Sequence, residues 1–229
     1  SLEFARGDDY VESYSLYIKN QDKNSISYSS NRITKPERNL RYIYRIHEVI
    51  EPNINVAIPK HTGSIIDYSS DYMKNRTNNR KKKDLDLLYL ELHDSFNEND
   101  QKRLARTYYY LGETYIALLE WENAIKYYGL RKELDNIKPE EEVLDSYYKI
   151  AALTDLYYSE QNSWPIREQL YLSSYNYSKL INKDRPDGLY MIGKHYLDNN
   201  NLDEAFRYFK QAFLIGNPIG DMNLREDIY

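Results

Sequence analysis

The chain of 229 residues contains no cysteine, and it lacks any apolar run long enough to span a membrane or to serve as a secretory signal. The missing cysteine excludes disulfide bonds and thiolate metal sites. A net charge of -5 and a charged fraction of 29% are typical of an ordinary soluble protein rather than a dedicated nucleic-acid binder. We therefore expect a cytoplasmic protein with no membrane span and no nucleic-acid partner.

What the sequence does contain is a repeating pattern of small and apolar residues at a spacing of about 34 residues. An apolar residue is followed by a small one three times, and the first and third copies later show an alanine and then an aromatic residue. The matching sets are Leu111-Gly112, Ala124 and Tyr128; Ile150-Ala151; and Ile192-Gly193, Ala205 and Phe209. Small residues at these positions let two helices approach closely, and this pattern is the signature of the tetratricopeptide (TPR) repeat.

The middle copy is irregular, because Arg167 stands where the alanine is expected and comes four positions late. A longer turn over residues 159–163 explains this delay. We predict three repeats, at about 105–138, 144–181 and 186–218. The expected fold is mainly α, a TPR-like helical solenoid over residues 101–229 that follows a linking helix at 69–100.

Residues 1–68 are expected to form a small β-rich segment. Alternation of apolar and polar residues over 14–18 and again over 42–46 predicts two strands, and residues 56–58 predict a further short one. A helical pattern begins at Ser69. Its apolar stripe, which includes Leu88 and Leu92, predicts a helix that docks on the first repeat.

The block Arg41–Ile50, whose sequence ends in Arg-Ile-His-Glu-Val-Ile, is followed by Ser69–Met73 and then by the repeats. From about Ser13 onward the chain resembles the C-terminal part of family 2 (GT-A) glycosyltransferases that carry a TPR tail. The resemblance implies that the intact enzyme binds a nucleotide-sugar and a divalent metal. It also implies that His47 faces the nucleotide diphosphate or its metal, and that Glu48 holds an acceptor group or orients the loop.

Two considerations limit what this chain does alone. A His-Glu pair at a strand end is also common on ordinary protein surfaces, so a simple surface role for the pair stays open. The chain also lacks the upstream nucleotide-binding half of such enzymes, so we expect no sugar transfer by these 229 residues. We expect no metal site or cofactor in this chain, because Asp84-Leu85-Asp86 falls in a helical pattern rather than after a buried strand.

The inner surface of the predicted solenoid is expected to bind a peptide or protein, or a glycan acceptor. All three repeats place tyrosine at the same inner position, and charged residues lie nearby; the candidate residues are Tyr109, Tyr148, Tyr190, Arg106 and Lys194. The alternative is that the three rings pack on adjacent helices. The basic run from Lys74 to Lys83 has two interpretations: it binds phosphate, or it is simply the solvent-exposed start of a helix.

Two functional hypotheses follow. In the first, the chain is the C-terminal portion of a nucleotide-sugar-dependent glycosyltransferase whose solenoid recruits the acceptor or a partner. In the second, it is a stand-alone TPR adaptor for protein-protein interaction.

Overall fold

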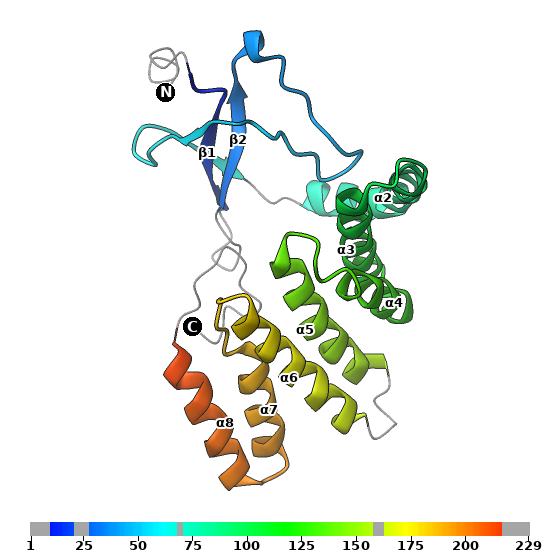
Figure 1. Ribbon diagram of the computed structural model, residues 1–229, viewed down its shortest axis with the longest axis vertical. Helices are drawn as coiled ribbons and strands as arrows, with labels where there is room; N and C mark the ends of the chain where they lie inside the picture. Colours follow the sequence, from blue (N-terminus) through cyan, green and yellow to red (C-terminus); the bar gives the residue numbers. More distant parts are fainter. Residues whose placement is uncertain (1–9, 21–27, 68–70, 158–162, 217–229) are drawn as a thin grey trace. The chain divides into compact units, whose positions relative to one another are not determined.

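The computed structural model describes residues 10–20, 28–67, 71–157 and 163–216 (Figure 1). Four short strands come first, and seven α-helices follow within the described residues. The predicted mainly α chain with a small β-rich segment at its start is therefore confirmed. Two compact units make up the chain, and their boundary lies between Leu87 and Leu88, inside α2 (Asp71–Asn97). The predicted linking helix at 69–100 corresponds to this helix.

The first unit contains a small mixed sheet centred on β1 (Ser13–Asn20). Along one edge β1 pairs antiparallel with β2 (Tyr28–Thr34), and along the other it pairs in parallel with β3 (Asn55–Ala57) and then β4 (Ser64–Asp67). Val11, Tyr14 and Ile58 are buried on one side of this sheet and form its apolar core. Within the described residues, β2 and β4 each pair with β1 alone.

The strand predicted over residues 42–46 is wrong. This stretch belongs to a loop in which Ile43 and Val49 form an isolated antiparallel bridge. Tyr44 and His47 adopt left-handed backbone angles, with φ of 67° and 49°, and an extended strand does not tolerate such angles. The alternation of apolar residues here therefore reflects a folded loop, whereas the predicted strands at 14–18 and 56–58 correspond to β1 and approximately to β3.

The second unit is built from consecutive helices that pack in pairs. The pairs are α3 (Gln101–Ala117) with α4 (Trp121–Lys132), α5 (Glu140–Tyr157) with α6 (Trp164–Leu180), and α7 (Asp187–Asp198) with α8 (Leu202–Ile215). Each pair also packs on the next, through α4 against α5 and α6 against α7. Figure 1 shows these helices lying side by side in chain order. Each predicted repeat therefore contains one helix pair.

The first and third pairs close through the same turn. At Leu119 and Asn200 the backbone adopts the left-handed conformation, with φ of 62° and 58°. The next residue in each turn donates its amide to a carbonyl five residues back, from Glu120 to Tyr115 at 3.0 Å and from Asn201 to Tyr196 at 2.8 Å. This bonding pattern satisfies a carbonyl at the helix end and turns the chain back along the helix. The turn of the middle pair, at 158–162, lies outside the described residues.

Close approach of the paired helices explains the small residues of the repeat. A Cβ atom added to Gly112 would lie 2.8 Å from the ring of Tyr128, and one added to Gly193 would lie 2.8 Å from the ring of Phe209. Real side chains do not approach so closely, so only glycine fits these contacts without a shift of the ring. The three alanines of the pattern are also buried: Ala124, Ala151 and Ala205.

The C-terminal half of α2 docks on the first pair, as the sequence predicts. Leu88 is buried, and the hydroxyl of Tyr89 lies 2.7 Å from that of Tyr115 and 2.9 Å from that of Tyr127. The rings of Tyr115 and Tyr127 stack with their centroids 5.6 Å apart. The stripe on α2 therefore contributes both apolar contact and a shared hydrogen-bonded cluster of tyrosines.

Candidate functional site

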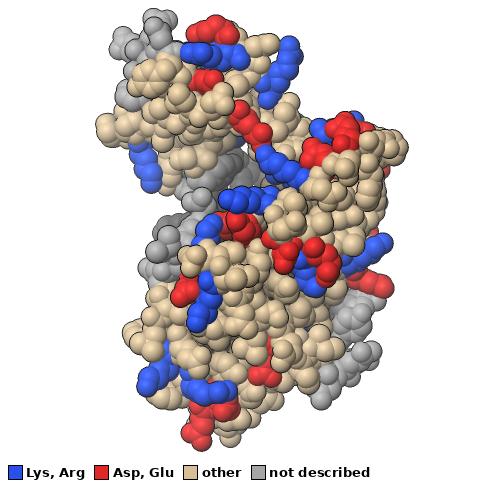
Figure 2. Space-filling model, in the orientation of Figure 1, with Lys and Arg blue, Asp and Glu red and all other residues tan. Residues whose placement is uncertain are grey.

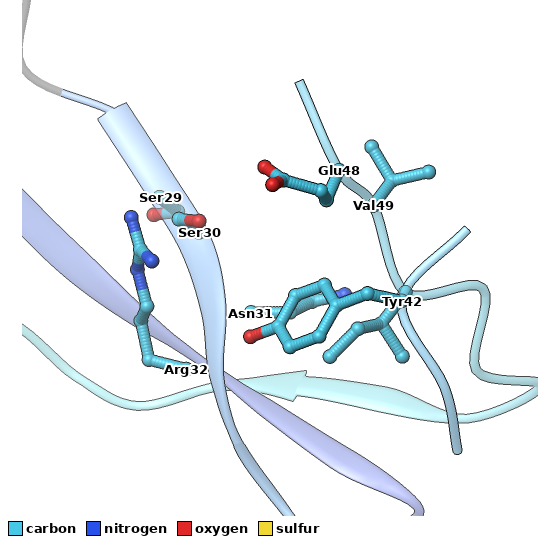
Figure 3. Close-up of a pocket in the computed structure, with 8 residues that line it drawn as sticks. Ser29, Ser30, Asn31, Arg32, Tyr42, Glu48 and Val49 are labelled. Carbon is cyan, nitrogen blue, oxygen red and sulfur yellow. The ribbon is translucent and has the colours of Figure 1, made fainter. Parts of the chain in front are cut away.

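An open polar cavity of about 570 Å³ lies in the first unit, and it includes Glu48 of the predicted site (Figure 3). One wall is β2, and the other is the loop that contains Tyr42 and Glu48. Figure 3 shows the carboxylate of Glu48 and the hydroxyl of Tyr42 both directed from the loop toward β2. The lining residues are Ser29, Ser30, Asn31, Arg32, Tyr42, Glu48, Val49 and Ile50.

The bridge in the loop holds Tyr42 and Glu48 next to each other. The amide of Ile43 donates to the carbonyl of Val49 at 2.9 Å, and the amide of Val49 donates back to Ile43 at 3.3 Å. Because Tyr42 precedes one partner and Glu48 precedes the other, the bridge fixes both side chains at one side of the loop. The buried side chain of Ile50 anchors the end of this segment.

A polar network across the sheet positions Asn31 on the opposite wall. The hydroxyl of Ser13 donates to Asn55 Oδ1 at 2.7 Å, and Asn55 Nδ2 donates to the hydroxyl of Ser15 at 2.8 Å. The hydroxyl of Ser15 in turn donates to Asn31 Oδ1. This chain of hydrogen bonds engages the side-chain oxygen of Asn31 and leaves its amide group as a donor at the cavity.

Several groups in the cavity have hydrogen-bonding capacity that the described residues do not use. Within the described part of the chain, Arg32, Tyr42 and Glu48 form no side-chain hydrogen bond or ion pair. Arg32 supplies a planar set of donors, and Glu48 supplies a carboxylate acceptor. The ring of Tyr42 is 60% exposed, so it offers a flat apolar face beside these polar groups. The cavity is therefore suited to a ligand that carries several hydroxyl groups next to apolar C–H surface.

His47, the other residue of the predicted pair, does not line this cavity. Its side chain is exposed. Its left-handed backbone conformation breaks the alternation of side-chain direction that a strand would have. Among the residues that the structure describes, no three His, Cys, Asp or Glu side chains come together as a metal site requires. The residues present therefore do not by themselves fit a divalent metal, and we place none on them.

The sequence missed Arg32, Asn31 and Tyr42 as members of the site. Arg32 and Asn31 lie on a strand with a polar sequence that periodicity does not detect. The alternation over 42–46 predicts a strand at Tyr42, where the structure has a loop. A weak signal existed, since β2 ends just before the Pro36 turn that leads into the loop. Only the pairing of β2 with β1 shows that the two segments face each other.

In the helical unit, two of the three inner tyrosines are buried. Tyr109 is 7% exposed and Tyr148 is 6% exposed, which favours packing on adjacent helices for these two rings. Tyr190 is half-buried and packs against Phe209, with ring centroids 5.5 Å apart. Arg106 is half-buried with its guanidinium over the ring of Tyr110, and Lys194 is exposed. Lys194, Arg106 and part of Tyr190 are thus the predicted partner-binding groups that solvent reaches.

The hydroxyl of Tyr109 belongs to a charged cluster between α3 and α5. It donates to Asp145 Oδ2 at 2.7 Å, and Lys149 Nζ lies 2.8 Å from the same carboxylate oxygen and also pairs with Glu113. Burial and the neighbouring carboxylates raise the pKa of Tyr109 far above its usual value. Burial disfavours the ammonium of Lys149, but Asp145 and Glu113 outweigh it and raise the pKa of that group. Tyr109 therefore has an internal structural role.

The basic run of α2 carries little concentrated charge where its side chains are described. Arg80 pairs with Asp84 at 3.4 Å, while Lys82 and Lys83 are exposed. The side chains of residues 74–79 lie outside the described part. Figure 2 shows basic and acidic side chains interspersed on the visible face, as is usual for solvated surfaces.

No protein-family model matches the chain, and no curated protein is significantly similar to it. Within the described residues, no helix combines the length and the apolar character that crossing a lipid bilayer requires.

Proposed function

We propose that this chain is the C-terminal portion of a nucleotide-sugar-dependent glycosyltransferase, in which the cavity around Glu48 contacts the acceptor sugar. The observation that carries the proposal is the convergence of Arg32, Tyr42 and Glu48 on one cavity, with hydrogen-bonding capacity that no described residue uses. Paired donors and acceptors beside an exposed aromatic face are what a sugar ring needs for recognition. In the resemblance to family 2 enzymes, Glu48 is also the residue assigned to the acceptor.

Two features of the first unit support a missing upstream partner domain. The β2 and β4 edges pair with no further strand among the described residues, and unpaired strand edges expose backbone groups to which another strand can bond. Ile65 and Ile66 of β4 are also 39% and 50% exposed, although both are large and apolar. A nucleotide-binding half would cover such surface and would supply the donor site and the metal.

A saccharide titration tests this proposal on the full 229-residue chain. Saturation-transfer NMR with a panel of mono- and disaccharides should detect weak binding of at least one sugar. Glu48→Gln and Tyr42→Ala should each weaken that binding at least about tenfold, because each removes a contact of about 1.4 kcal/mol. Glu37→Gln is the matched control, since this carboxylate lies on the 3-10 helix outside the cavity.

Equal binding by the Glu48→Gln and Glu37→Gln variants would contradict the acceptor role of the cavity. The proposal also implies that the chain alone transfers no sugar. Incubation with nucleotide-sugars should therefore yield no product above the rate without protein, and measurable turnover would refute this part.

The second candidate function is a TPR adaptor that binds a partner polypeptide. The recurrence of the same glycine contact and the same turn in the first and third helix pairs supports a TPR-like solenoid, in which the first helices of successive pairs share one face. On α3 and α7 that face carries Arg106, Tyr190 and Lys194.

A displayed library of random peptides tests the adaptor function. Peptides enriched on the wild-type chain should bind at least about tenfold more weakly to the Arg106→Ala and Lys194→Ala variants, the loss expected when a charged contact is removed. Lys210→Ala on α8 is the control. The absence of any enriched sequence, or equal binding by all variants, would argue against this candidate.

A further inference from the structure

The middle helix pair breaks the repeat at one position, and the structure shows a cavity there. Ala124 and Ala205 fill the equivalent positions of the other two pairs and are completely or almost completely buried. In the middle pair Arg167 replaces the alanine, and it lines a cavity of about 260 Å³ between α6 and α7. Trp164, Tyr171, Met191, Lys194, His195 and Asp198 complete the lining.

The spacing of these residues places one face of each helix toward the cavity. On α6 the contributors lie at intervals of three and four residues, and on α7 they follow the i, i+3, i+4, i+7 pattern of a single helix face. The two helices pack closely beside the cavity, since a Cβ on Gly188 would lie 2.4 Å from the backbone oxygen of Tyr171. The cavity is therefore bounded by a fixed helix contact.

An ordered aromatic stack forms one wall. The rings of Trp164 and His195 are nearly parallel, with centroids 3.4 Å apart, and the edge of Tyr196 meets Trp164 at 5.9 Å. Tyr196 is held in turn by a hydrogen bond of 3.0 Å to Glu168. Such a wall is rigid, so a ligand entering the cavity would not have to order it.

The charged groups of the cavity favour an anion. The central carbon of the Arg167 guanidinium lies over the Trp164 ring, 5.1 Å from its centroid. This contact holds the guanidinium beside the aromatic wall. Lys194 forms no hydrogen bond or ion pair within the described part of the chain. Among the described lining residues Asp198 is the only acidic one, whereas Arg167 and Lys194 are both cationic.

We infer that the cavity between α6 and α7 is a binding subsite for an oxyanion group, a carboxylate or a phosphate ester, attached to a small apolar body. Arg167 binds the anion with its paired N–H donors, Lys194 adds a second positive charge, and Tyr171 and Met191 contact the apolar part. This cavity is separate from the one around Glu48, so its occupancy does not depend on the proposed acceptor role. Lys194 also belongs to the face proposed for the adaptor, so Arg167, which is not part of that face, tests the cavity alone.

Three small probes separate the possible chemistries. Benzoate and phenyl phosphate share an aromatic ring but carry different anions, and benzamide is the neutral counterpart. Binding is followed by the fluorescence of Trp164 in the Trp121→Phe variant, because the chain has two tryptophans and this change leaves Trp164 as the only one. We expect a saturable change with at least one anion and a benzamide affinity at least about tenfold lower.

Arg167→Ala should reduce anion affinity at least about tenfold, and Lys194→Gln should reduce it severalfold. Arg167→Ala restores the alanine of the other two pairs, so the fold should be kept, and circular dichroism checks this. Lys210→Gln removes the same charge from the exposed surface of α8 and should leave the affinity unchanged. A preference for carboxylate or for phosphate identifies which oxyanion the subsite takes.

Three results would overturn the assignment. They are the absence of saturable binding by either anion, equal binding of benzamide, and an affinity that survives Arg167→Ala as well as it survives Lys210→Gln. The loss of sugar binding in the Glu48→Gln variant has no bearing on these outcomes, so the two cavities are tested separately.

Discussion

A substitution at Arg131, the residue that ties the first helix pair to the second, tests the connection between α4 and α5. Its side chain is 0% exposed, and Nε donates to Glu142 Oε2 at 2.9 Å. The two terminal nitrogens donate to the backbone oxygens of Leu134, Ile137 and Pro139 at distances of 2.8 to 2.9 Å. One guanidinium therefore satisfies a buried carboxylate and the carbonyls of the connection between α4 and α5.

Arg131→Met should lower the free energy of unfolding by about 3–5 kcal/mol, the cost of leaving one member of a buried ion pair without its partner. Most of this loss arises at Glu142, whose side chain is only 7% exposed. The three carbonyl oxygens are partly buried and regain some hydration, so they add less. Urea unfolding followed by circular dichroism measures the difference.

Two comparisons make this prediction specific. The double variant Arg131→Met, Glu142→Leu removes both charges and should be more stable than Arg131→Met alone, because no unpaired carboxylate remains. Arg207→Met breaks an exposed pair with Glu204 on α8 and should change stability little. A loss in Arg131→Met no larger than that in Arg207→Met would refute the role of the buried pair.

The buried pair of Arg131 and Glu142 also predicts that the stability loss of Arg131→Met depends on pH. Burial raises the pKa of Glu142, and Arg131 acts against this rise. Removal of Arg131 should therefore raise that pKa further. A carboxyl whose pKa is raised in the folded state destabilises the fold when it is ionised, so the free energy of unfolding falls as the pH rises. The deficit of the Arg131→Met variant should shrink between pH 7 and pH 5, and a constant deficit over this range would contradict the reasoning.

Further predictions concern the tyrosines of the helical unit. Burial, together with neighbouring carboxylates, raises the pKa of Tyr109 and Tyr128 far above the usual 10.0, so the folded chain retains protons that the unfolded chain releases above that pH. Their contribution is complete below pH 10 and should then fall by about 1.4 kcal/mol per pH unit for each group; alkaline titration should show their tyrosinate absorbance only on unfolding. Tyr89→Phe should cost about 1 kcal/mol in urea unfolding, because two neighbouring hydroxyls lose their shared partner, whereas Tyr10→Phe at an exposed position should cost almost nothing.

The helical unit was largely predictable from the sequence because its packing has a strict chemical signature. Gly112 and Gly193 stand where an aromatic ring leaves no room for a methyl group, so the pattern of small residues gave the positions of the helix pairs. The first unit was predictable only in part. Its β2 strand is mostly polar and is stabilised by pairing with β1, which periodicity cannot detect, and β4 is too short to stand out.

The candidate site shows the same limit. Glu48 was found through the resemblance to a family, whereas Arg32 and Asn31 join it only because the strand and the loop face each other in space. The three inner tyrosines occupy the same position of the repeat in the sequence, but they are not equally exposed in the structure. Tyr109 is buried and donates a hydrogen bond to Asp145, whereas part of Tyr190 stays open to solvent.

Comparison of two glycines in the first helix pair tests the close packing of helices most directly. Gly112→Ala should lower the free energy of unfolding by about 1–3 kcal/mol, because the new methyl group would lie 2.8 Å from the Tyr128 ring. Gly129→Ala, in α4 with nothing within 4 Å of the added carbon, should instead raise it by about 0.5–1 kcal/mol. Opposite signs in urea unfolding support the packing described, and an equal gain in both variants would contradict it.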